Sequence, residues 1–214
     1  MSVLSGKKIL LGVTAGIAAY KSASLVRAFI KAGASVQVVM TEKAKDFVTP
    51  LTLSTLSRNE VHSSFTIEGD DNAVWTNHVE LGLWADLMVI APATANTLSK
   101  MANGASDNLL LATYLSAKCP VYFAPAMDLD MYIHPSSTNS FQKLQSYGNV
   151  MIEATSGELA SGLVGKGRMA EPEDIVTFIE NDVMGKLPLR GKRVMITAGP
   201  TYEAIDPVRF IGNH

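Results

Sequence analysis

Ser161, His78 and Asp128 are polar side chains in segments of this sequence that could contact a ligand. Ser161 lies in LASGLVGKGRM, residues 159–169, whose three glycines give a loop the freedom to close over a ligand. His78 could act as a base near neutral pH, and Asp128 follows the apolar run VYFAPAM. A plain glycine turn and a structural histidine are the alternatives, so these residues alone do not define a function.

A glycine turn near the amino terminus is typical of a phosphate site. GVTAGIAAYK, residues 12–21, turns a predicted strand into a helix, whose free amides and dipole favour an anion. It lacks the full G-x-G-x-x-G spacing, and Thr41 rather than an acidic residue follows the second predicted strand. The pattern favours a mononucleotide over a nicotinamide dinucleotide, with a plain strand-to-helix turn as the alternative. The sequence shows no metal-ligand spacing, Walker loop or G-x-S-x-G elbow.

Residues 91–110, APATANTLSKMANGASDNLL, combine small side chains with hydroxyl and amide groups directly after an apolar run. Small residues let a flat ring approach the backbone, and Thr94, Asn96 and Thr97 can bond the polar edge of such a ring. Helix capping is the alternative role for such Asn and Thr residues. The segment predicts one wall of a ligand pocket.

Apolar runs that predict parallel strands precede these polar segments. Helical patterns separate the runs, as in residues 18–33 and 171–181. A parallel sheet with helices on both faces follows, which is a three-layer α/β/α, doubly wound fold of the flavodoxin or Rossmann type. Such sheets bind ligands beyond the carboxyl ends of their strands. The predicted strands are residues 7–14, 35–40, 86–92, 120–125 and 149–154.

Composition narrows the class of protein. The 214 residues are 47% hydrophobic and 18% charged with a net charge of -2, which indicates a globular protein without the basic footprint of a nucleic-acid or membrane-surface binder. No apolar run is long enough to span a bilayer, and no secretory signal is expected. The single cysteine, Cys119, fits a reducing compartment and is interpreted as a small structural residue. We expect a cytoplasmic protein.

A second segment follows the helix predicted over residues 171–181. GKLPLRG, residues 185–191, has the proline and glycines of a linker, and GKRVMITAGPT, residues 191–201, predicts another strand and glycine turn. Residues 192–214 are too few to bury a core alone, so they are interpreted as the start of a second domain or a segment docked on the first.

Four ordered motifs over about residues 5–180 resemble the homo-oligomeric flavin-containing cysteine decarboxylases, most closely the phosphopantothenoylcysteine decarboxylase domains. They are GVTAGIAAYK, NHVELGLWADLMVIAPATANTLSKMANGASDNLL, PAMDLDMY and ASGLVGKGRM. The resemblance implies an FMN cofactor and an active-site role for His78 in base catalysis or substrate orientation. It places Asp128, Met131, Ser161 and Met169 beside the substrate. It assigns FMN binding to Gly16, Ile17, Ala18, Thr41, Thr94, Ala95, Asn96, Thr97 and Ala126.

The reaction that the resemblance implies converts 4'-phospho-N-pantothenoylcysteine to 4'-phosphopantetheine and carbon dioxide in coenzyme A biosynthesis. FMN oxidises the cysteine side chain to a thioaldehyde, carbon dioxide leaves, and an enethiolate remains. Reduced FMN then returns a hydride while a protein acid supplies a proton. The resemblance also implies trimers, often stacked into dodecamers, with His78 serving a neighbour's flavin.

The tail resembles the opening of the phosphopantothenate-cysteine ligase domain that bacteria fuse behind this decarboxylase. The resemblance divides the chain into a decarboxylase domain over 1–184, a linker over 185–191 and a truncated ligase start over 192–214. Ligase activity is not expected from so short a piece.

Two departures from the family pattern fall on catalytic positions. Asp128 stands where the family has an asparagine that binds the substrate carboxylate, and an ionised pair at 4 Å would repel by roughly 4 kcal/mol at an effective dielectric near 20. Ser161 stands where the family has the cysteine that protonates the enethiolate, and an alcohol is a much weaker acid than a thiol. Asp128, protonated beside a second carboxylate, could be the missing acid or could relay its proton through Ser161.

Three other functions remain open at this stage. A flavoprotein decarboxylase that stops at the enethiol needs no acid at position 161, which Ser161 permits. A flavin prenyltransferase of related fold is disfavoured by the block around His78 and by the ligase-like tail. A non-enzymatic regulatory or interaction protein would keep the fold without the chemistry.

Overall fold

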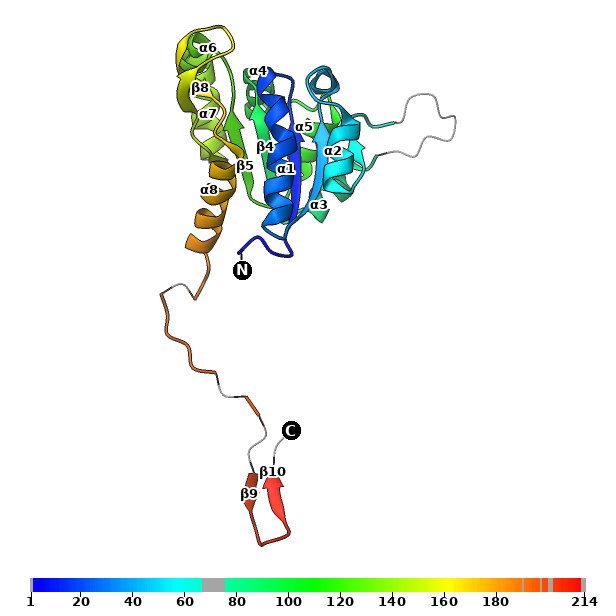
Figure 1. The fold of residues 1–214 in the computed structure, drawn as a ribbon, viewed down its shortest axis with the longest axis vertical. Coiled ribbons are helices and arrows are strands. Elements are labelled where there is room, and N and C mark those ends of the chain that lie inside the picture. The colour runs from blue at the N-terminus through cyan, green and yellow to red at the C-terminus, as the bar shows by residue number, and fades with distance from the viewer. Residues whose placement is uncertain (1, 67–75, 190, 197, 200–201, 213–214) are drawn as a thin grey trace.

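A six-stranded parallel sheet forms the centre of the protein (Figure 1). The computed structural model describes residues 2–66, 76–189, 191–196, 198–199 and 202–212. The sheet order β3-β2-β1-β4-β5-β6 reverses direction between β1 and β4, which confirms the predicted doubly wound fold. In sheet order the strands are Val61–His62, Ser35–Met40, Lys8–Val13, Leu87–Ala93, Val121–Pro125 and Val150–Met151.

Helices cover both faces of the sheet, as the sequence predicted. Alternate residues of β1 point to opposite sides, so Ile9 and Leu11 join one apolar core while Leu10 joins the other. The first core packs under α1 (Ser22–Lys31), α2 (Pro50–Ser57) and α8 (Pro172–Gly185). The second packs under α3 (His78–Trp84), α4 (Ala95–Ala102), α5 (Leu109–Ser116) and α7 (Pro135–Ser146).

Short helical segments follow three of the strands at the carboxyl edge of the sheet. They are η1 (Ile17–Lys21) after β1, η2 (Glu42–Asp46) after β2 and α6 (Leu129–Ile133) after β5. Each begins within a few residues of its strand, so their first turns surround the crevice beyond β1 and β4.

A two-stranded antiparallel hairpin stands apart from the central sheet. Its strands are β7 (Thr155–Glu158) and β8 (Val164–Arg168), so the glycine-rich stretch at 159–169 forms the turn and the second strand. The hairpin lies close to α6, because an added Cβ at Gly167 would come within 2.4 Å of the Met127 carbonyl oxygen. The predicted flexible loop is therefore a paired hairpin whose turn holds Ser161.

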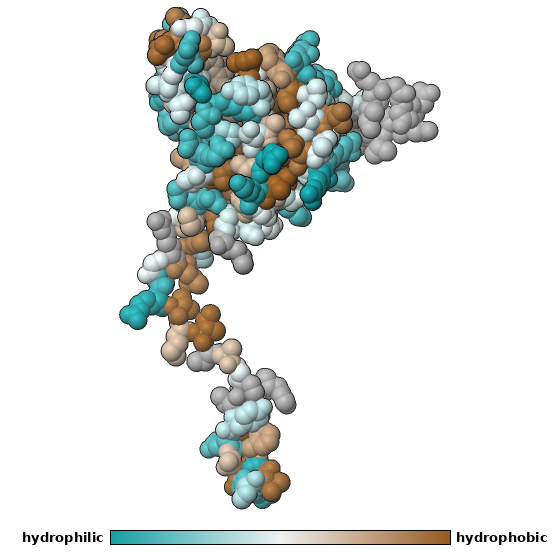
Figure 2. All heavy atoms as spheres, viewed as in Figure 1, coloured by the Kyte–Doolittle hydropathy of each residue, from teal (hydrophilic) through white to brown (hydrophobic). Residues whose placement is uncertain are grey.

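The carboxy-terminal segment extends away from the sheet (Figure 1). The strand predicted for 191–201 was wrong over its described residues, 191–196 and 198–199, and a small hairpin of β9 (Tyr202–Ala204) and β10 (Phe210–Gly212) follows instead. Apolar side chains along this segment are exposed, including Met195 at 88% and Ile196 at 82%, and Figure 2 shows brown spheres there. A strand needs a neighbour to pair its backbone, and residues 191–196 and 198–199 pair with no described strand.

Candidate active site

A cavity of about 1010 Å³ lies beyond the carboxyl ends of β1 and β4. Its wall combines the turn after β1, the residue after β2, the first turn of α4, the loop after β5 and the hairpin turn. These are the places that the sequence singled out, brought together because parallel strands all end at one edge. Every residue expected to contact a flavin lines it: Gly16, Ile17, Ala18, Thr41, Thr94, Ala95, Asn96, Thr97 and Ala126.

A buried hydroxyl joins the turns after β1 and β4. Thr14 Oγ1 donates to the Pro92 carbonyl at 2.7 Å and accepts from the Thr94 amide at 3.1 Å. The turns approach closely, since a Cβ added at Gly16 would lie 3.3 Å from Thr94 Cγ2. Helix α4 then begins without a side-chain cap on its first amides. The backbone amides in the first turn of α4 are therefore available to donate hydrogen bonds to an anion.

Thr41 presents a hydroxyl that the protein leaves unused. Its Oγ1 atom is buried and has no hydrogen-bond partner among the described residues, although the residue lines the cavity. A buried polar atom without a partner is costly, so a bound ligand with a donor or acceptor at this point would satisfy it.

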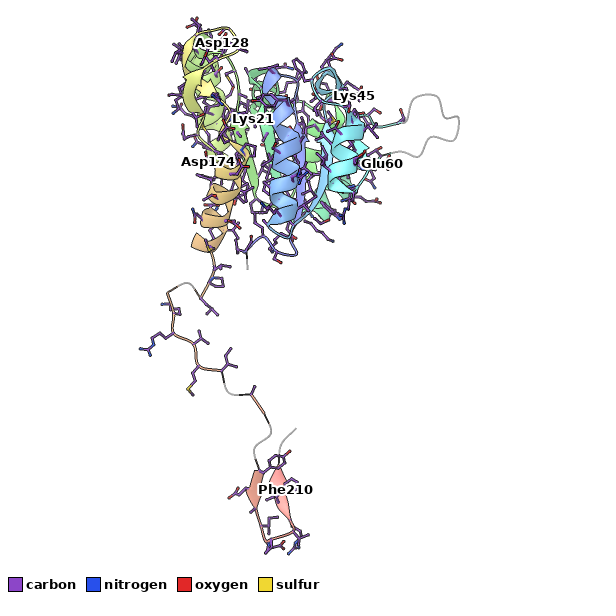
Figure 3. All side chains as sticks on the ribbon, viewed as in Figure 1. Lys21, Lys45, Glu60, Asp128, Asp174 and Phe210 are labelled. Carbon is purple, nitrogen blue, oxygen red and sulfur yellow. The ribbon has the colours of Figure 1, made fainter. Side chains whose placement is uncertain are left out.

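Asp128 and Ser161 meet across the cavity mouth. Ser161 Oγ donates to Asp128 Oδ1 at 3.0 Å, and the Leu129 amide donates to the same oxygen at 2.7 Å as α6 begins. Figure 3 labels Asp128 beside the hairpin at the end of the molecule remote from the tail. The two departures from the family pattern are therefore in direct contact, although 33 residues separate them in sequence.

The hairpin is fixed against α6 by polar and apolar contacts. Lys166 Nζ bonds Glu153 Oε2 at 2.6 Å and lies 5.6 Å from the ring centre of Tyr132. Met131 and Met169, both expected beside the substrate, line the cavity, with Met131 half exposed and Met169 buried. The hairpin turn thus forms one wall of the cavity beside α6.

Lys21 is a cavity residue that the sequence reasoning missed. Its side chain is 6% exposed, and Nζ donates to the Met169 carbonyl at 3.1 Å and to Glu171 Oε1 at 2.9 Å. The hydrogen bond from Lys21 holds the pKa of Glu171 below its ordinary value, with Arg168 adding to the effect. The sequence signal that could have identified Lys21 is a lysine at the end of the motif GVTAGIAAYK, on a helical face that is otherwise apolar. Lys21, labelled in Figure 3, therefore links η1 to the residue that follows β8.

His78 is the one predicted site residue that does not line this cavity. It opens α3, where the Asn77 side chain caps the Val79 and Glu80 amides. Its ring meets Phe65 edge-on at 5.9 Å, and Nδ1 is buried without a hydrogen-bond partner in the described part of the chain. His78 is therefore not part of the cavity wall that the other candidate residues form.

Two negative findings concern the described residues alone. They contain no group of three or more His, Cys, Asp or Glu side chains placed to hold a metal ion. They also contain no helix that is long and apolar enough to cross a membrane. Cys119 lies half-buried away from the cavity wall, and burial raises the pKa of its thiol.

The fold and the cavity define an α/β protein that binds a ligand at the switch point of a doubly wound sheet. Residues 2–184 match the Flavoprotein family, so the chain belongs to that family. Residues 189–214 match the DNA/pantothenate metabolism flavoprotein C-terminal domain.

Curated relatives extend the match along the chain. Coenzyme A biosynthesis bifunctional protein CoaBC of Bacillus subtilis is 46% identical over 213 residues, covering 99% of this chain and 52% of that protein. A cysteine/cysteine sulfinic acid decarboxylase from an unknown prokaryotic organism is 57% identical over 171 residues, covering 78% of this chain and 47% of that protein. The chain spans about half the length of the curated relatives it matches.

The match to solved structures of the same fold covers nearly the whole length of each solved chain. A cysteine-to-serine mutant of PPC decarboxylase, complexed with pantothenoylaminoethenethiol, has a TM-score of 0.73 and 32% identity, covering 83% of this chain and 98% of that one. The FMN binding protein AtHal3 has a TM-score of 0.70 and 31% identity, covering 85% of this chain and 98% of that one.

Proposed function

We propose that this chain is an FMN-dependent decarboxylase that converts 4'-phospho-N-pantothenoylcysteine to 4'-phosphopantetheine. One observation carries the proposal: the residues expected to bind flavin and those expected to contact substrate line a single cavity. The names of the CoaBC and PPC decarboxylase relatives support the substrate. The name of AtHal3 supports the cofactor.

The cavity residues fit a flavin mononucleotide. The Thr41 hydroxyl, which has no partner among the described residues, and the first amides of α4, which no side chain caps, offer polar partners. Gly16, Ala18 and Ala95 leave room for a flat ring. FMN, when bound, supplies the reversible acceptance of a hydride that this decarboxylation requires. The chain's own part is to hold the ring at the sheet edge and to keep water from the reacting carbon.

The hairpin and α6 form the substrate side of the proposed site. Met131 and Met169 offer apolar contact, and the turn carrying Ser161 closes over the mouth. Lys21 fixes the end of this hairpin through the Met169 carbonyl, so that the substrate side keeps its distance from the flavin side.

The proposal includes the organisation of the chain. Residues 1–184 would form the decarboxylase domain, 185–191 a linker and 192–214 the start of a ligase domain. The protein would be cytoplasmic and would assemble as a trimer or dodecamer. His78 would then complete the cavity of a neighbouring subunit. Its absence from the wall of its own cavity supports this, as does its Nδ1 atom, which has no partner in the part of the chain that the structure describes.

Flavin spectroscopy combined with carbon dioxide release tests the proposal. The purified protein is expected to be yellow, to lose its flavin spectrum on extraction and to regain it with FMN. With 4'-phospho-N-pantothenoylcysteine it should release carbon dioxide and form the saturated thiol, identified by mass spectrometry. A yellow protein that releases no carbon dioxide from this substrate would support the interaction-protein alternative.

Two further candidates use the same site. Ser161 in place of a thiol favours a decarboxylase that stops at the enethiol, and the relative solved with an enethiol is itself a cysteine-to-serine mutant. The relative named as a cysteine/cysteine sulfinic acid decarboxylase favours a free amino acid, whose ammonium group could pair with the Asp128 carboxylate. Product masses separate the first from our proposal, and competition between cysteine and the acylated substrate separates the second.

A further inference from the structure

The two oxygens of the Asp128 carboxyl have different surroundings. Oδ1 accepts hydrogen bonds from the Ser161 hydroxyl at 3.0 Å and from the Leu129 amide at 2.7 Å. Oδ2 has no hydrogen-bond or ion-pair partner among the described residues, on a half-buried side chain that lines the cavity. An oxygen that already accepts two donors is a poor place for a proton, which leaves Oδ2 as the proton-bearing atom.

We propose that Asp128 is the general acid of this site, acting through Oδ2, and that Ser161 is a positioning residue and not a proton relay. The inference rests on the proposed decarboxylation and adds the identity of its acid. The relay considered from the sequence would require Ser161 to hand its proton to the substrate, whereas the structure has that hydroxyl donating to Oδ1.

The proton enters the reaction after carbon dioxide has left. The enethiolate carries its electron pair to the carbon that lost the carboxylate. A C–H bond forms there as the O–H bond at Oδ2 breaks, and Asp128 is left as a carboxylate. The product of this step is a thioaldehyde, and FMN, when bound in the cavity, would supply the hydride that reduces it to the saturated thiolate.

The substrate itself explains how Asp128 obtains its proton. Two carboxylates that meet in a closed site retain one proton between them, because both cannot stay ionised at short range. When the substrate carboxylate leaves as carbon dioxide, the shared proton stays on Asp128. The proton then lies beside the carbon that must receive it. The Asp128 side chain therefore first binds the substrate carboxylate and then supplies the proton that takes the place of the carboxylate.

The backbone around Asp128 gives this acid a fixed position. Asp128 is the N-cap of α6, and the Met127 amide before it donates to the Gly167 carbonyl of β8 at 3.0 Å. Ser161 adds a third restraint from the hairpin turn. A hydroxyl is sufficient for that role, since it needs to donate a hydrogen bond and does not need to give up its proton.

Product analysis on the FMN-loaded protein tests the assignment. Four variants are compared with the wild type for carbon dioxide release and for the ratio of saturated thiol to enethiol. They are Asp128→Asn, Ser161→Ala, the double variant Asp128→Asn/Ser161→Cys, and Asp130→Asn. Asp130 is the matched control, because it is an exposed acid on the same helix and does not line the cavity.

We expect Asp128→Asn to lower the saturated fraction by at least about tenfold, with enethiol in its place, because general acids contribute large factors. Ser161→Ala should still give mainly saturated product at a reduced rate, and Asp130→Asn should match the wild type. The double variant should regain saturated product, because a thiol then supplies the acid. A wild-type product ratio in Asp128→Asn overturns the proposal, as does a loss in Ser161→Ala equal to that in Asp128→Asn.

Infrared spectroscopy provides a readout that does not depend on turnover. With phosphopantothenoylalanine, which keeps the carboxylate and lacks the thiol, the wild type should show a carboxylic-acid band that is absent in Asp128→Asn and kept in Asp130→Asn. No such band in the wild type overturns the proposal, whatever the variants do in the assay. Failure of the wild type to release carbon dioxide from the acylated cysteine would instead count against the proposed function.

Discussion

At the scale of single residues, Thr41 and Thr14 show how a hydroxyl can serve either a ligand or the fold. Both lie where a strand ends at the cavity edge, but Thr14 bonds the Pro92 carbonyl while Thr41 Oγ1 has no partner among the described residues. Thr41→Val should leave the stability of the FMN-free protein unchanged or slightly higher, because no hydrogen bond is lost. It should weaken FMN binding by about 0.5–1.5 kcal/mol, which a fluorescence titration measures.

Thr14→Val is the matched control for that change. It removes the hydroxyl that joins the two turns, so it should cost about 1–3 kcal/mol of unfolding free energy even without flavin. Urea denaturation of both variants checks the contrast. Equal losses of stability would mean that Thr41 is a structural residue after all.

Lys21 is a second single residue with a predictable effect, and its contribution to the free energy of unfolding depends on pH. Lys21→Met should destabilise the protein by about 1–3 kcal/mol near neutral pH, with only a small share from the ion pair because Glu171 is 43% exposed. Because the native state lowers the pKa of Glu171, its stabilising contribution is present above the unfolded pKa and is lost as the pH falls through the folded one. The difference between wild type and variant should therefore shrink below about pH 4.3.

Urea denaturation at several pH values tests this, with Lys31→Met as the control. Lys31 is exposed on α1 and forms no ion pair among the described residues, so its removal should have little effect at any pH. A Lys21→Met deficit that stays constant down to strongly acidic pH would contradict the role given to Glu171.

At the scale of secondary-structure elements, the hairpin of β7 and β8 depends on close contact with the loop before α6. Gly167 has φ +151, and its added Cβ would lie 2.4 Å from the Met127 carbonyl oxygen, which is backbone and cannot move aside. Gly167→Ala should displace the hairpin and lower the rate of the proposed decarboxylation by at least about tenfold, because misplaced site groups are costly. The far-ultraviolet circular dichroism spectrum should stay close to that of the wild type.

Gly162→Ala separates this contact from simple backbone strain. Gly162 also has positive φ, +83, but nothing lies within 4 Å of its added Cβ. The cost should be about 1–2 kcal/mol of local strain, with most of the activity kept. If both alanine variants lose activity equally, loop conformation and not contact with Met127 governs the site.

The elements also show what the sequence could and could not predict. Strands buried on both faces are continuous apolar runs, so the four longer strands of the sheet were recognisable. The run predicted over 149–154 contains only the two-residue strand β6. The edge strand Val61–His62 is short and half-buried, and the hairpin at 155–168 is polar and rich in glycine, so neither has a strand-like pattern. The bond between Asp128 and Ser161 depends on how α6 and the hairpin pack, which local sequence does not encode.

At the scale of the whole molecule, the position of His78 is the main reason to expect an assembly. The cavity holds every other proposed site residue, whereas His78 lies at the start of α3 with Nδ1 buried and without a partner among the described residues. A site completed by a second subunit explains both facts, because a histidine that serves a neighbour need not face its own cavity.

Mixed assemblies test this arrangement directly. His78→Asn removes the contributed side chain, and Gly16→Trp fills the cavity that would receive it, so each variant alone should be inactive. Unfolded together and reassembled, the two should form about a quarter of sites with both an open cavity and a native histidine, if cavity and histidine come from different subunits. Activity should return in the mixture and should scale with the product of the two fractions. If His78 instead acts on its own subunit's flavin, no mixture contains a complete site and activity stays at the level of the separate variants.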